Sequence, residues 1–536
     1  MRSTMMEYPL TVASIMRVGT SIFGGKGVST ATETGVRHRD YRTVGERAAR
    51  LANALRSIGV DGDQRVGTLM WNNAEHLEAY LAVPSMGAVL HTLNLRLLPP
   101  QIGYIATHAE DYAIICDESL VPLLASVLPH APTVKHVLVS GAFTGDLPGV
   151  SVHSYEDLLA GSSEVFDWPV LDELSAAAMC YTSGTTGNPK GVVYSHRSMY
   201  LHTLGLCTGN VFSISEADRL LPVVPMFHAN AWGLPYAGMF AGADLVMPDR
   251  FMQPSSLVSL IASSRATIAG GVPTIWTSVL EEVRAHGGDL SSLRVCIGGG
   301  SAVPRALMAA YSAELGLQLV QAWGMTETSP LGSVAWAPSS AADSWSYRDS
   351  GGRLLATLEG RITGDDGVLL PSDGVAVGEL EIRGAWVTAS YYLDPSPEKF
   401  HDGWLRTGDV GSLDPLGYVR LTDRAKDVIK SGGEWISSME LENHLMAHPA
   451  VLEAGVIGIP DARWGERPLA AVVVRPGLSV SPGSLRGFLE DRVARWQIPE
   501  YWAFIDQVPR TSVGKFNKRA MRDAYAAGSY EVIEAR

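Results

Sequence analysis

The sequence predicts an α/β protein with a second, smaller folding unit at its carboxyl end. Short apolar runs, each about as long as a buried strand, alternate with segments of helical periodicity as far as residue 297, a pattern typical of layered folds with largely parallel sheets. Residues 351–384 are rich in glycine and alternate apolar with polar side chains, which favours a small antiparallel or barrel-like β region. Helical and strand patterns return after Asp423, so we expect a domain boundary between residues 420 and 430.

The expected elements follow in order from these patterns. Thr43 and Glu46 have the T-x-x-E spacing of a capping box, and apolar residues at helical spacing predict a helix from there to residue 58. A second helix is expected over residues 73–83. In the carboxyl-terminal unit we expect helices at 440–447 and 482–494 and strands at 454–457 and 469–474. The strands expected before them are at 65–70, 88–93, 112–116, 136–139, 176–181, 220–224, 243–247, 266–269 and 293–297.

Composition excludes several classes of protein. The chain has 42 Lys and Arg against 56 Asp and Glu, a formal net charge of −14, which argues against nucleic-acid binding because that requires basic surface. A hydrophobic content of 46% excludes a disordered chain. The four cysteines lack the spacing of a zinc site or redox pair. The sequence shows no signal peptide and no run of 18 apolar residues. We therefore expect a cytoplasmic protein without a transmembrane segment, and leave peripheral membrane contact open.

The most informative segment is residues 181–191, YTSGTTGNPKG. Its three glycines let the backbone turn tightly, while four Ser and Thr hydroxyls and the Lys190 ammonium gather on one short loop. Such a loop suits the oxygens of a polyphosphate. It does not match the Walker A pattern, which requires G-x-x-x-x-G-K-[ST].

This loop resembles the phosphate-binding signature of the adenylate-forming superfamily, which includes acyl-CoA synthetases, amino-acid adenylation domains and firefly luciferase. Four further segments resemble that family's motifs in the same order along the chain. They are QAWGMTE at 321–327, WLRTGD at 404–409, DRAKD at 423–427 and PRTSVGK at 509–515.

The resemblance implies a large amino-terminal domain, residues 1–424, made of two αβ lobes and a β-barrel. A small α+β domain, residues 425–536, would be hinged to it. It also implies a reaction in two halves. A carboxylate attacks the α-phosphate of ATP to give acyl-adenylate and pyrophosphate, and a thiol then displaces AMP.

The resemblance assigns the ATP side of the site as follows. Trp323 stacks on adenine, Gln321 contacts its amino edge and Thr326 belongs to the same motif. Asp409 accepts from the ribose hydroxyls, and Arg424 reaches the ribose or α-phosphate. Mg²⁺ is coordinated by Glu327 beside Thr185, because hard oxygen ligands suit this ion. The β- and γ-phosphates are held by Thr182, Ser183, Gly184, Thr185, Thr186 and Lys190.

The catalytic group by resemblance is Lys515, which would bridge the incoming carboxylate and the α-phosphate. Lys426 matches the hinge about which the small domain rotates between the half-reactions. Rotation would withdraw Lys515 and bring a loop to the coenzyme A side of the site, formed by Gly432, Gly433 and Glu434. We interpret the basic residues Lys518, Arg519 and Arg522 as a solvated helix face.

The acyl side depends on four segments. His228 lies in the acyl-site motif, residues 225–233, and would orient the carboxylate or the α-phosphate; Trp232 belongs to the same motif. No Asp occurs at 226–232, which argues for an acid without an amino group. Gly324 would leave room for a chain longer than acetate. Trp276 either gates a hydrophobic acyl tunnel or is a buried core residue, and Gly300 would lie between the adenine and acyl sites.

These features are closest to a bacterial medium- or long-chain fatty acyl-CoA ligase that uses ATP, Mg²⁺ and coenzyme A. The alternatives are a ligase for aryl or other non-fatty acids, an acyl-AMP ligase that loads a separate carrier protein, and an ATP-binding protein without catalysis. A homodimer is expected by analogy with related bacterial enzymes.

Overall fold

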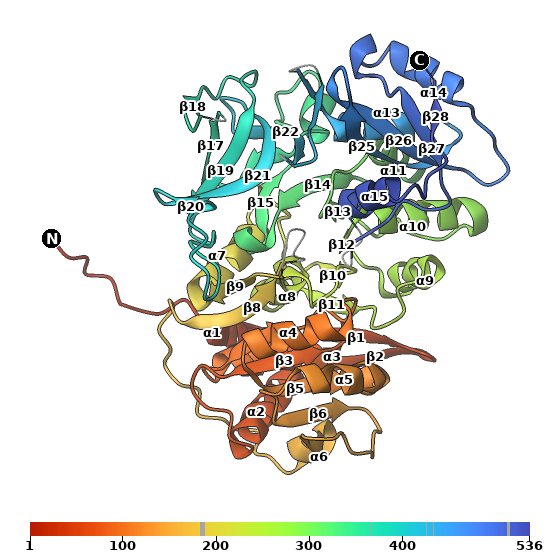
Figure 1. Ribbon diagram of the computed structural model, residues 1–536. Helices are drawn as coiled ribbons and strands as arrows, with labels where there is room; N and C mark the ends of the chain where they lie inside the picture. Colours follow the sequence, from red (N-terminus) through yellow and green to blue (C-terminus); the bar gives the residue numbers. More distant parts are fainter. Residues whose placement is uncertain (183–187, 365, 425, 432–433, 512–514, 536) are drawn as a thin grey trace.

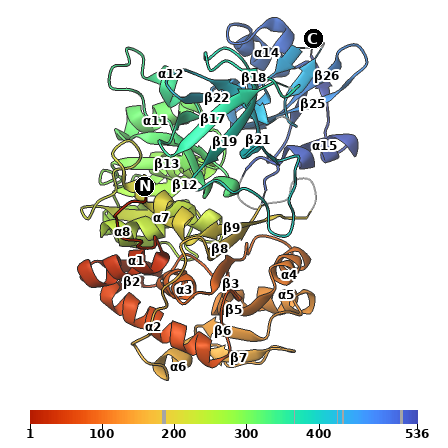
Figure 2. The ribbon, with the colours of Figure 1, turned by 90° about the vertical axis from the view of Figure 1, so that its left-hand side faces the viewer.

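The computed structural model describes residues 1–536 except 183–187, 365, 425, 432–433, 512–514 and 536. Two α/β lobes and a carboxyl-terminal unit stack one on another, with the first lobe at the bottom of Figure 1 and the carboxyl-terminal unit at its top right. The view in Figure 2 shows the same three tiers from the side. The predicted α/β class, with a large amino-terminal part and a small carboxyl-terminal unit, is confirmed.

The first lobe is built on a seven-stranded sheet, parallel except for its last pair. Because helices pack against the sheet, its strands read as continuous apolar runs. The sheet order is β7 (Ser151–Ser154), β6 (His136–Ser140), β5 (Asp111–Asp117), β3 (Arg65–Leu69), β4 (Val89–Thr92), β8 (Ala176–Tyr181), β9 (Gly191–Ser195). The helices are α2 (Tyr41–Ser57), α3 (Ala74–Ser85), α4 (Pro99–His108), α5 (Val121–Val127) and α6 (Tyr155–Ala160).

The predicted capping box of α2 is wrong, although the helix itself is present. The helix begins at Tyr41, and the carboxylate of Asp40 accepts a hydrogen bond from the Thr43 backbone N–H at 2.7 Å. Asp is among the strongest N-cap residues, and its position three residues before Thr43 lets the helix begin earlier than the T-x-x-E pattern suggests.

The second lobe contains part of a larger sheet, and this part is parallel except for its last pair. Strands far apart in the sequence form it, since β1 near the amino terminus pairs with β11. The strands, in sheet order, are β14 (Leu319–Gly324), β13 (Val295–Gly299), β12 (Ile268–Gly271), β10 (Arg219–Pro222), β11 (Asp244–Met247), β1 (Gly27–Thr32) and β2 (Gly35–Asp40). The helices of the lobe are α7 (His196–Cys207), α8 (Leu234–Ala241), α9 (Pro254–Ser264), α10 (Pro273–His286) and α11 (Arg305–Leu315), and α1 (Val12–Arg17) packs beside α8.

The expected barrel is not separate in the described residues. Its antiparallel strands continue the second lobe's sheet beyond β14 to make one 15-stranded sheet with an open order. The pairing of β14 with β15 joins the two parts, so hydrogen bonds run on without a break. The added strands are β15 (Leu331–Val334), β16 (Gly352–Leu354), β22 (Tyr418–Arg424), β21 (Trp404–Leu413), β19 (Gly378–Gly384), β17 (Leu358–Thr363) and β18 (Leu369–Leu370), with β20 (Phe400–His401) beside β21 and α12 (Trp345–Arg348) before β16.

The carboxyl-terminal unit has its own six-stranded sheet, and its apolar clusters are separate from those of the lobes. Strand β22 of the large sheet ends at Arg424 and the first strand of the new sheet starts at Ile429, close to the expected boundary. An ion pair of 3.1 Å between Arg475 and Glu281 ties the unit to α10. Its elements are β23 (Ile429–Ser431), β24 (Glu434–Ile436), α13 (Ser438–Met446), β25 (Val451–Asp461), β26 (Gly465–Val474), α14 (Pro482–Glu490), β27 (Tyr501–Phe504), α15 (Lys518–Ala526) and β28 (Ile533–Glu534).

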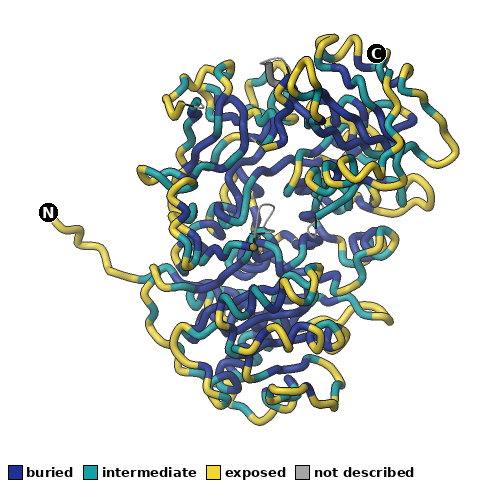
Figure 3. The backbone as a smooth tube through the Cα atoms, in the orientation of Figure 1, coloured by how far each residue is buried: buried dark blue, intermediate teal, exposed yellow. Residues whose placement is uncertain are grey.

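Burial follows the three tiers, with dark, buried strands at the centre of each and exposed loops around them (Figure 3). The amino-terminal residues 1–8 are exposed and project away from the body of the molecule. Among the described residues, no helix has the length and apolar character needed to span a membrane.

Candidate active site

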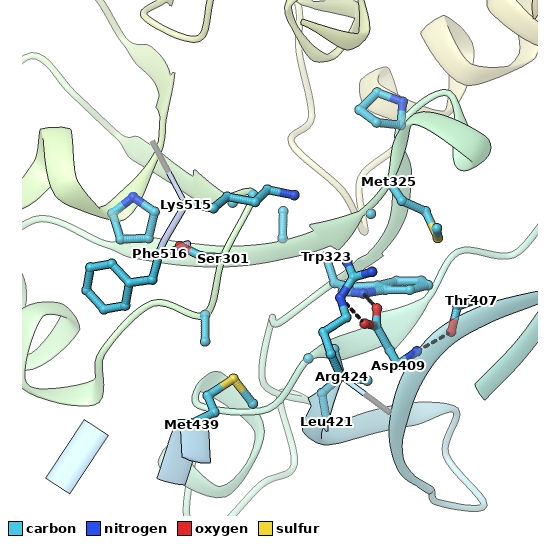
Figure 4. Close-up of a pocket in the computed structure, with 18 of the residues that line it drawn as sticks. Ser301, Trp323, Met325, Thr407, Asp409, Leu421, Arg424, Met439, Lys515 and Phe516 are labelled. Carbon is cyan, nitrogen blue, oxygen red and sulfur yellow. Dashed lines mark hydrogen bonds and ion pairs between the residues drawn. The ribbon is translucent and has the colours of Figure 1, made fainter. Parts of the chain in front are cut away.

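A cavity of about 1660 Å³ lies where the two lobes meet the carboxyl-terminal unit. The carboxyl ends of the parallel strands β13 and β14 line it, together with residues of β21, β22 and α13. In open α/β sheets, ligands bind outside the carboxyl ends of the strands. In Figure 4, Lys515 reaches into this space from one side while Trp323, Asp409 and Arg424 approach from another.

The Lys515 side chain lies beside Gly300 at the end of β13. Gly300 has a φ of +83°, and a Cβ on it would lie 3.6 Å from Cε of Lys515. The backbone of Lys515 is held by Thr511, whose N–H donates to the Lys515 carbonyl at 2.7 Å. Burial lowers the pKa of Lys515 to about 8, with Arg424 and Lys426 also opposing its charge and Asp409 favouring it. The ammonium is therefore charged at neutral pH and loses its proton in mildly alkaline solution.

His228 lies next to Lys515 on a strained segment. Burial lowers its pKa to about 3, and the positive charges of Lys515 and Arg96 act in the same direction, so the imidazole is neutral. Residues 229–232 following it all have positive φ values, between 42° and 56°. Such conformations cost roughly 1–3 kcal/mol per residue and concentrate at functional sites. The last of them, Trp232, places its ring against Gly299 and Gly300.

Trp323, Asp409 and Arg424 form one hydrogen-bonded chain. The indole N–H of Trp323 donates to Oδ2 of Asp409 at 2.7 Å, and Nε of Arg424 contacts Oδ1 at 2.6 Å (Figure 4). Asp409 raises the pKa of Arg424 further, so the guanidinium is permanently charged. The chain fixes the plane of the indole and places a carboxylate and a guanidinium at its edge, an arrangement that suits a planar base and its ribose.

Glu327 brings a buried carboxylate to the same cavity. Its Oε1 accepts a hydrogen bond of 2.6 Å from the hydroxyl of Tyr391, while Oε2 accepts none from the described residues. A buried carboxylate that lines a cavity favours a cation there. No group of three or more His, Cys, Asp or Glu side chains converges within the described part of the chain, so Mg²⁺ here would take its other ligands from phosphate oxygens and water. The site fits that ion.

Lys190 stands at the end of the phosphate loop. Its backbone carbonyl accepts from the Thr182 N–H at 2.9 Å, and its own N–H donates to the Thr182 hydroxyl. The ammonium contacts Asp394 at 3.0 Å and Ser396 at 2.5 Å. Both partners belong to the segment between β19 and β20, so Lys190 has an acidic and a hydroxyl partner there.

Comparison with known families decides the class. The family model described as AMP-binding enzyme matches residues 25–392, and the model of its C-terminal domain matches residues 440–515. The chain belongs to the AMP-binding enzymes. The resemblance to the adenylate-forming superfamily is thereby confirmed.

Several characterised relatives align with this AMP-binding enzyme over nearly its whole length. The 3-methylmercaptopropionyl-CoA ligase of Ruegeria pomeroyi is 41% identical, covering 98% of this chain and 99% of its own. The medium-chain-fatty-acid–CoA ligase of Ectopseudomonas oleovorans is 39% identical, and the long-chain enzyme of Thermus thermophilus 42%, with coverage of 97–98%. An anthranilate-CoA ligase solved with anthranoyl-AMP superposes with a TM-score of 0.88 at 26% identity, over 99% of this chain and 100% of its own.

The predicted site residues of this AMP-binding enzyme mostly gather at the cavity. Those that line it are Thr182, Lys190, His228, Trp232, Gly300, Gln321, Trp323, Gly324, Thr326, Glu327, Asp409, Arg424, Lys426 and Lys515. The predicted Ser183, Gly184, Thr185, Thr186, Gly432 and Gly433 lie outside the described residues, as does the side chain of Glu434.

Trp276 does not line the cavity in this conformation. It is fully buried, and its indole N–H donates to the backbone carbonyls of Gly271 and Ile297 at 3.1 and 2.9 Å. Of the two interpretations left open for Trp276, the structure therefore supports the core residue. Of the two tryptophans, Trp232 is the one that lines the cavity.

Two further residues have contacts that differ from expectation. The Gln321 amide is occupied by the backbone: its oxygen accepts from the Val303 N–H at 2.6 Å and its nitrogen donates to the Ser350 carbonyl. It is not free to contact adenine in this conformation. At Gly324 a Cβ would lie 1.9 Å from the Pro330 carbonyl oxygen. Close backbone approach requires this glycine, independently of how much room the acyl chain needs.

The expectation of a solvated face at Lys518 is wrong. Its ammonium is buried between Glu442 at 3.0 Å and Asp423 at 3.9 Å and also contacts the Ser438 hydroxyl. Arg522 contacts Asp427 at 2.8 Å, whereas Arg519 is exposed as expected. The start of α15 is rich in charge, which is typical of a solvated helix. The sequence gives no sign of acidic partners, because Glu442 and Asp423 lie far from Lys518 along the chain. Sequence reasoning also missed Tyr391 and Asp394, which carry no distinctive motif.

Proposed function

We propose that this protein is an AMP-forming ligase that activates an apolar carboxylic acid with ATP and transfers the acyl group to coenzyme A. The preferred acids are medium- or long-chain fatty acids. The observation that carries this proposal is a cluster of buried apolar side chains that line the same cavity as Lys515 and His228.

The first half-reaction follows from the charges around the cavity. A carboxylate oxygen attacks the α-phosphorus, and the bond from that phosphorus to the bridging oxygen of pyrophosphate breaks. Lys515 contacts both reacting anions and offsets their repulsion, a form of electrostatic stabilisation typically worth 10²–10³-fold in rate. Bound at Glu327, Mg²⁺ would neutralise charge on the phosphates and hold pyrophosphate as it leaves.

The second half-reaction needs a thiol at the acyl carbonyl. Its sulfur forms the thioester bond, the carbonyl–oxygen bond to AMP breaks, and the thiol proton passes to solvent. In this structure Lys515 occupies the cavity, which corresponds to the adenylation arrangement. The gap between β22 and β23 contains Lys426, and rotation there would exchange Lys515 for the 431–434 loop.

The choice of acyl group is supported by six apolar side chains that line the cavity and belong to one apolar cluster, against which Trp232 packs. Each of them is at most 8% exposed. None of them carries a charge, and an acid with an amino group or a second carboxylate would lose its hydration there without a partner. These residues are Leu206, Phe212, Leu234, Ile297, Ala322 and Leu331.

The relatives support this choice and add one alternative. Two of the three relatives named above are fatty-acid–CoA ligases, and the third takes 3-methylmercaptopropionate, a short acid with an apolar thioether tail. The latter acid would also fit an apolar end without charges. Aromatic acids are represented among the structural relatives at 26% identity.

Acid-dependent exchange of pyrophosphate into ATP tests the first half. Straight-chain acids from C2 to C18, 3-methylmercaptopropionate and aromatic acids form the panel, and adding coenzyme A or a carrier protein identifies the acceptor. We expect the highest kcat/KM with fatty acids of intermediate or greater length and with coenzyme A. Exchange with no acid in the panel would reject the enzyme assignment, and a preference for aromatic acids would reject the fatty-acid assignment.

A pair of variants tests the acyl end directly. Phe212→Ala lengthens the apolar end and should move the preferred chain length upward by two or more carbons. Phe240→Ala is the control, because Phe240 packs on Tyr200 and does not line the cavity. An equal chain-length profile in both variants would contradict the placement of the acyl chain.

A further inference from the structure

The segment of residues 386–396, called here the bridging segment, lies between β19 and β20 and contacts two separate parts of the site. It follows no motif that sequence reasoning singled out. Its residues make backbone and side-chain hydrogen bonds both to the turn that carries Glu327 and to the end of the phosphate loop. A change in the conformation of this segment would therefore affect both Glu327 and Lys190.

Four hydrogen bonds join the bridging segment to the Glu327 turn, residues 326–331. The Thr388 N–H donates to the Glu327 carbonyl at 2.8 Å, and the hydroxyl of Ser329 donates to the Trp386 carbonyl at the same distance. The Trp386 indole donates to the Leu331 carbonyl at 2.9 Å. The fourth bond alone involves the Glu327 carboxylate: the Tyr391 hydroxyl donates to Oε1 at 2.6 Å.

The other side of the bridging segment meets the phosphate loop. The Tyr392 N–H donates to the Gly191 carbonyl at 2.8 Å, and Asp394 and Ser396 contact the Lys190 ammonium. That ammonium also lies 4.8 Å above the centre of the Tyr391 ring, within the range of a cation–π contact. Tyr391 thus touches Glu327 with its hydroxyl and Lys190 with its ring.

We propose that Tyr391 is a positioning residue for the metal–nucleotide complex, acting through Glu327. Its hydroxyl fixes the rotation of a buried carboxylate and uses one oxygen, which leaves Oε2 for the cation. The ring of Tyr391 is itself buried, and its centre lies 5.2 Å from that of the Phe400 ring. This packing fixes the position of the hydroxyl. This inference rests on the proposed function, because it takes Mg²⁺–ATP as the ligand.

Outer-shell hydrogen bonds to a metal-binding carboxylate typically change metal affinity 10–100-fold when removed. Tyr391→Phe deletes the hydroxyl and keeps the ring over Lys190, so it separates the two contacts. We expect it to weaken binding of Mn²⁺, a spectroscopic substitute for Mg²⁺, about tenfold in the presence of the α,β-methylene analogue of ATP. Binding of the analogue without metal should change less than twofold.

The test uses electron paramagnetic resonance of free Mn²⁺ on the full chain, with Mg²⁺-dependent pyrophosphate exchange beside it. In the exchange assay the KM for Mg²⁺ should rise about tenfold, with little change in kcat at saturating Mg²⁺. Tyr311→Phe is the matched control, because it removes another buried phenol hydrogen bond, to the Trp276 carbonyl at 2.7 Å. It should leave Mn²⁺ affinity unchanged.

A double-mutant cycle with Glu327→Gln distinguishes the possible failures. If Tyr391 acts through Glu327, adding Tyr391→Phe to Glu327→Gln changes Mn²⁺ affinity no further. Weak Mn²⁺ binding in Glu327→Gln but wild-type binding in Tyr391→Phe would overturn this inference and leave the proposed function standing. Unchanged binding in Glu327→Gln would overturn the metal assignment itself. Equal losses of metal-free and metal-dependent nucleotide binding in Tyr391→Phe would show a merely structural role and also overturn the inference.

Discussion

Replacing Lys518 by methionine removes the cation that pairs with two buried carboxylates, Asp423 and Glu442. The side chains of Lys518, Glu442 and Asp423 are 11%, 8% and 4% exposed, so water screens the cluster poorly. Removing one partner of a buried ion pair typically costs about 3–5 kcal/mol, because the remaining charge has no compensation. We expect a loss of this size at pH 8 in the local stability of α13 and β25.

The loss should depend on pH through Glu442. Burial raises the pKa of Glu442 to about 7 even though Lys518 lowers it, so without Lys518 its pKa is higher still. A carboxyl whose pKa is higher in the folded than in the unfolded state makes the protein less stable as the pH rises toward the folded-state pKa. Because the pKa of Glu442 is higher in the variant, the variant loses more stability between pH 6 and pH 8 than the wild type. The cost of the substitution should therefore be about 1 kcal/mol smaller at pH 6 than at pH 8.

Hydrogen–deuterium exchange of peptides covering Ser438–Met446 and Val451–Asp461 measures these local stabilities at both pH values. Arg519→Met is the control: it is the next residue of the same helix, and its side chain is 66% exposed, so we expect a change within about 0.5 kcal/mol. Equal effects of the two substitutions, or a Lys518→Met cost that is the same at pH 6 and pH 8, would refute the assignment of Lys518 to a buried ion cluster.

Four further predictions concern the site. Lys515→Ala should lower acyl-AMP formation about 10²–10³-fold in pyrophosphate exchange and spare thioester formation from supplied acyl-AMP; equal loss of both halves would contradict its role. Since burial lowers the pKa of Lys515 to about 8, wild-type adenylation should fall about tenfold per pH unit above that value, and Lys515→Arg should shift this limb upward in a pH–rate profile. Gly324→Ala should lower stability by about 1–3 kcal/mol in thermal unfolding, because its Cβ would meet the Pro330 carbonyl at 1.9 Å, whereas Gly487→Ala has open space and should not. Asp394→Ala frees the half-exposed Lys190 from an ion pair and should tighten ATP binding about two- to fivefold by calorimetry; weaker binding would show that Asp394 supports the phosphate site.

The site was predictable wherever a motif carries its chemistry in adjacent residues. The motifs predicted that Lys515, Trp323 and Asp409 belong to one site, and the separate segment 225–233 added His228; all four line one cavity. Local patterns also predicted most strands of the first lobe, because apolar runs between polar turns reflect burial directly. They gave the wrong N-cap for α2, because Asp40 lies three residues before Thr43 and caps the helix in its place.

For some residues the sequence could not say whether the side chain is buried in the core, lines the cavity or is exposed to solvent. Trp276 and Trp232 are both aromatic residues of acyl-side segments, yet only Trp232 meets the cavity. The amide of Gln321 is satisfied by two backbone groups that lie 18 and 29 residues away. Lys518 looked solvated because its partners, Asp423 and Glu442, come from β22 and α13.

By itself the sequence determined the family and the α/β class with a small carboxyl-terminal unit, since these depend on residue identity and short spacing. Only the tertiary structure decided which of Trp232 and Trp276 lines the cavity, that the antiparallel strands extend one sheet, and that Tyr391 joins Glu327 to Lys190. The physical reason is that hydrogen bonds, burial and charge partners are set by contacts between distant segments. Tyr391 and Glu327 are 64 residues apart along the chain and 2.6 Å apart in space.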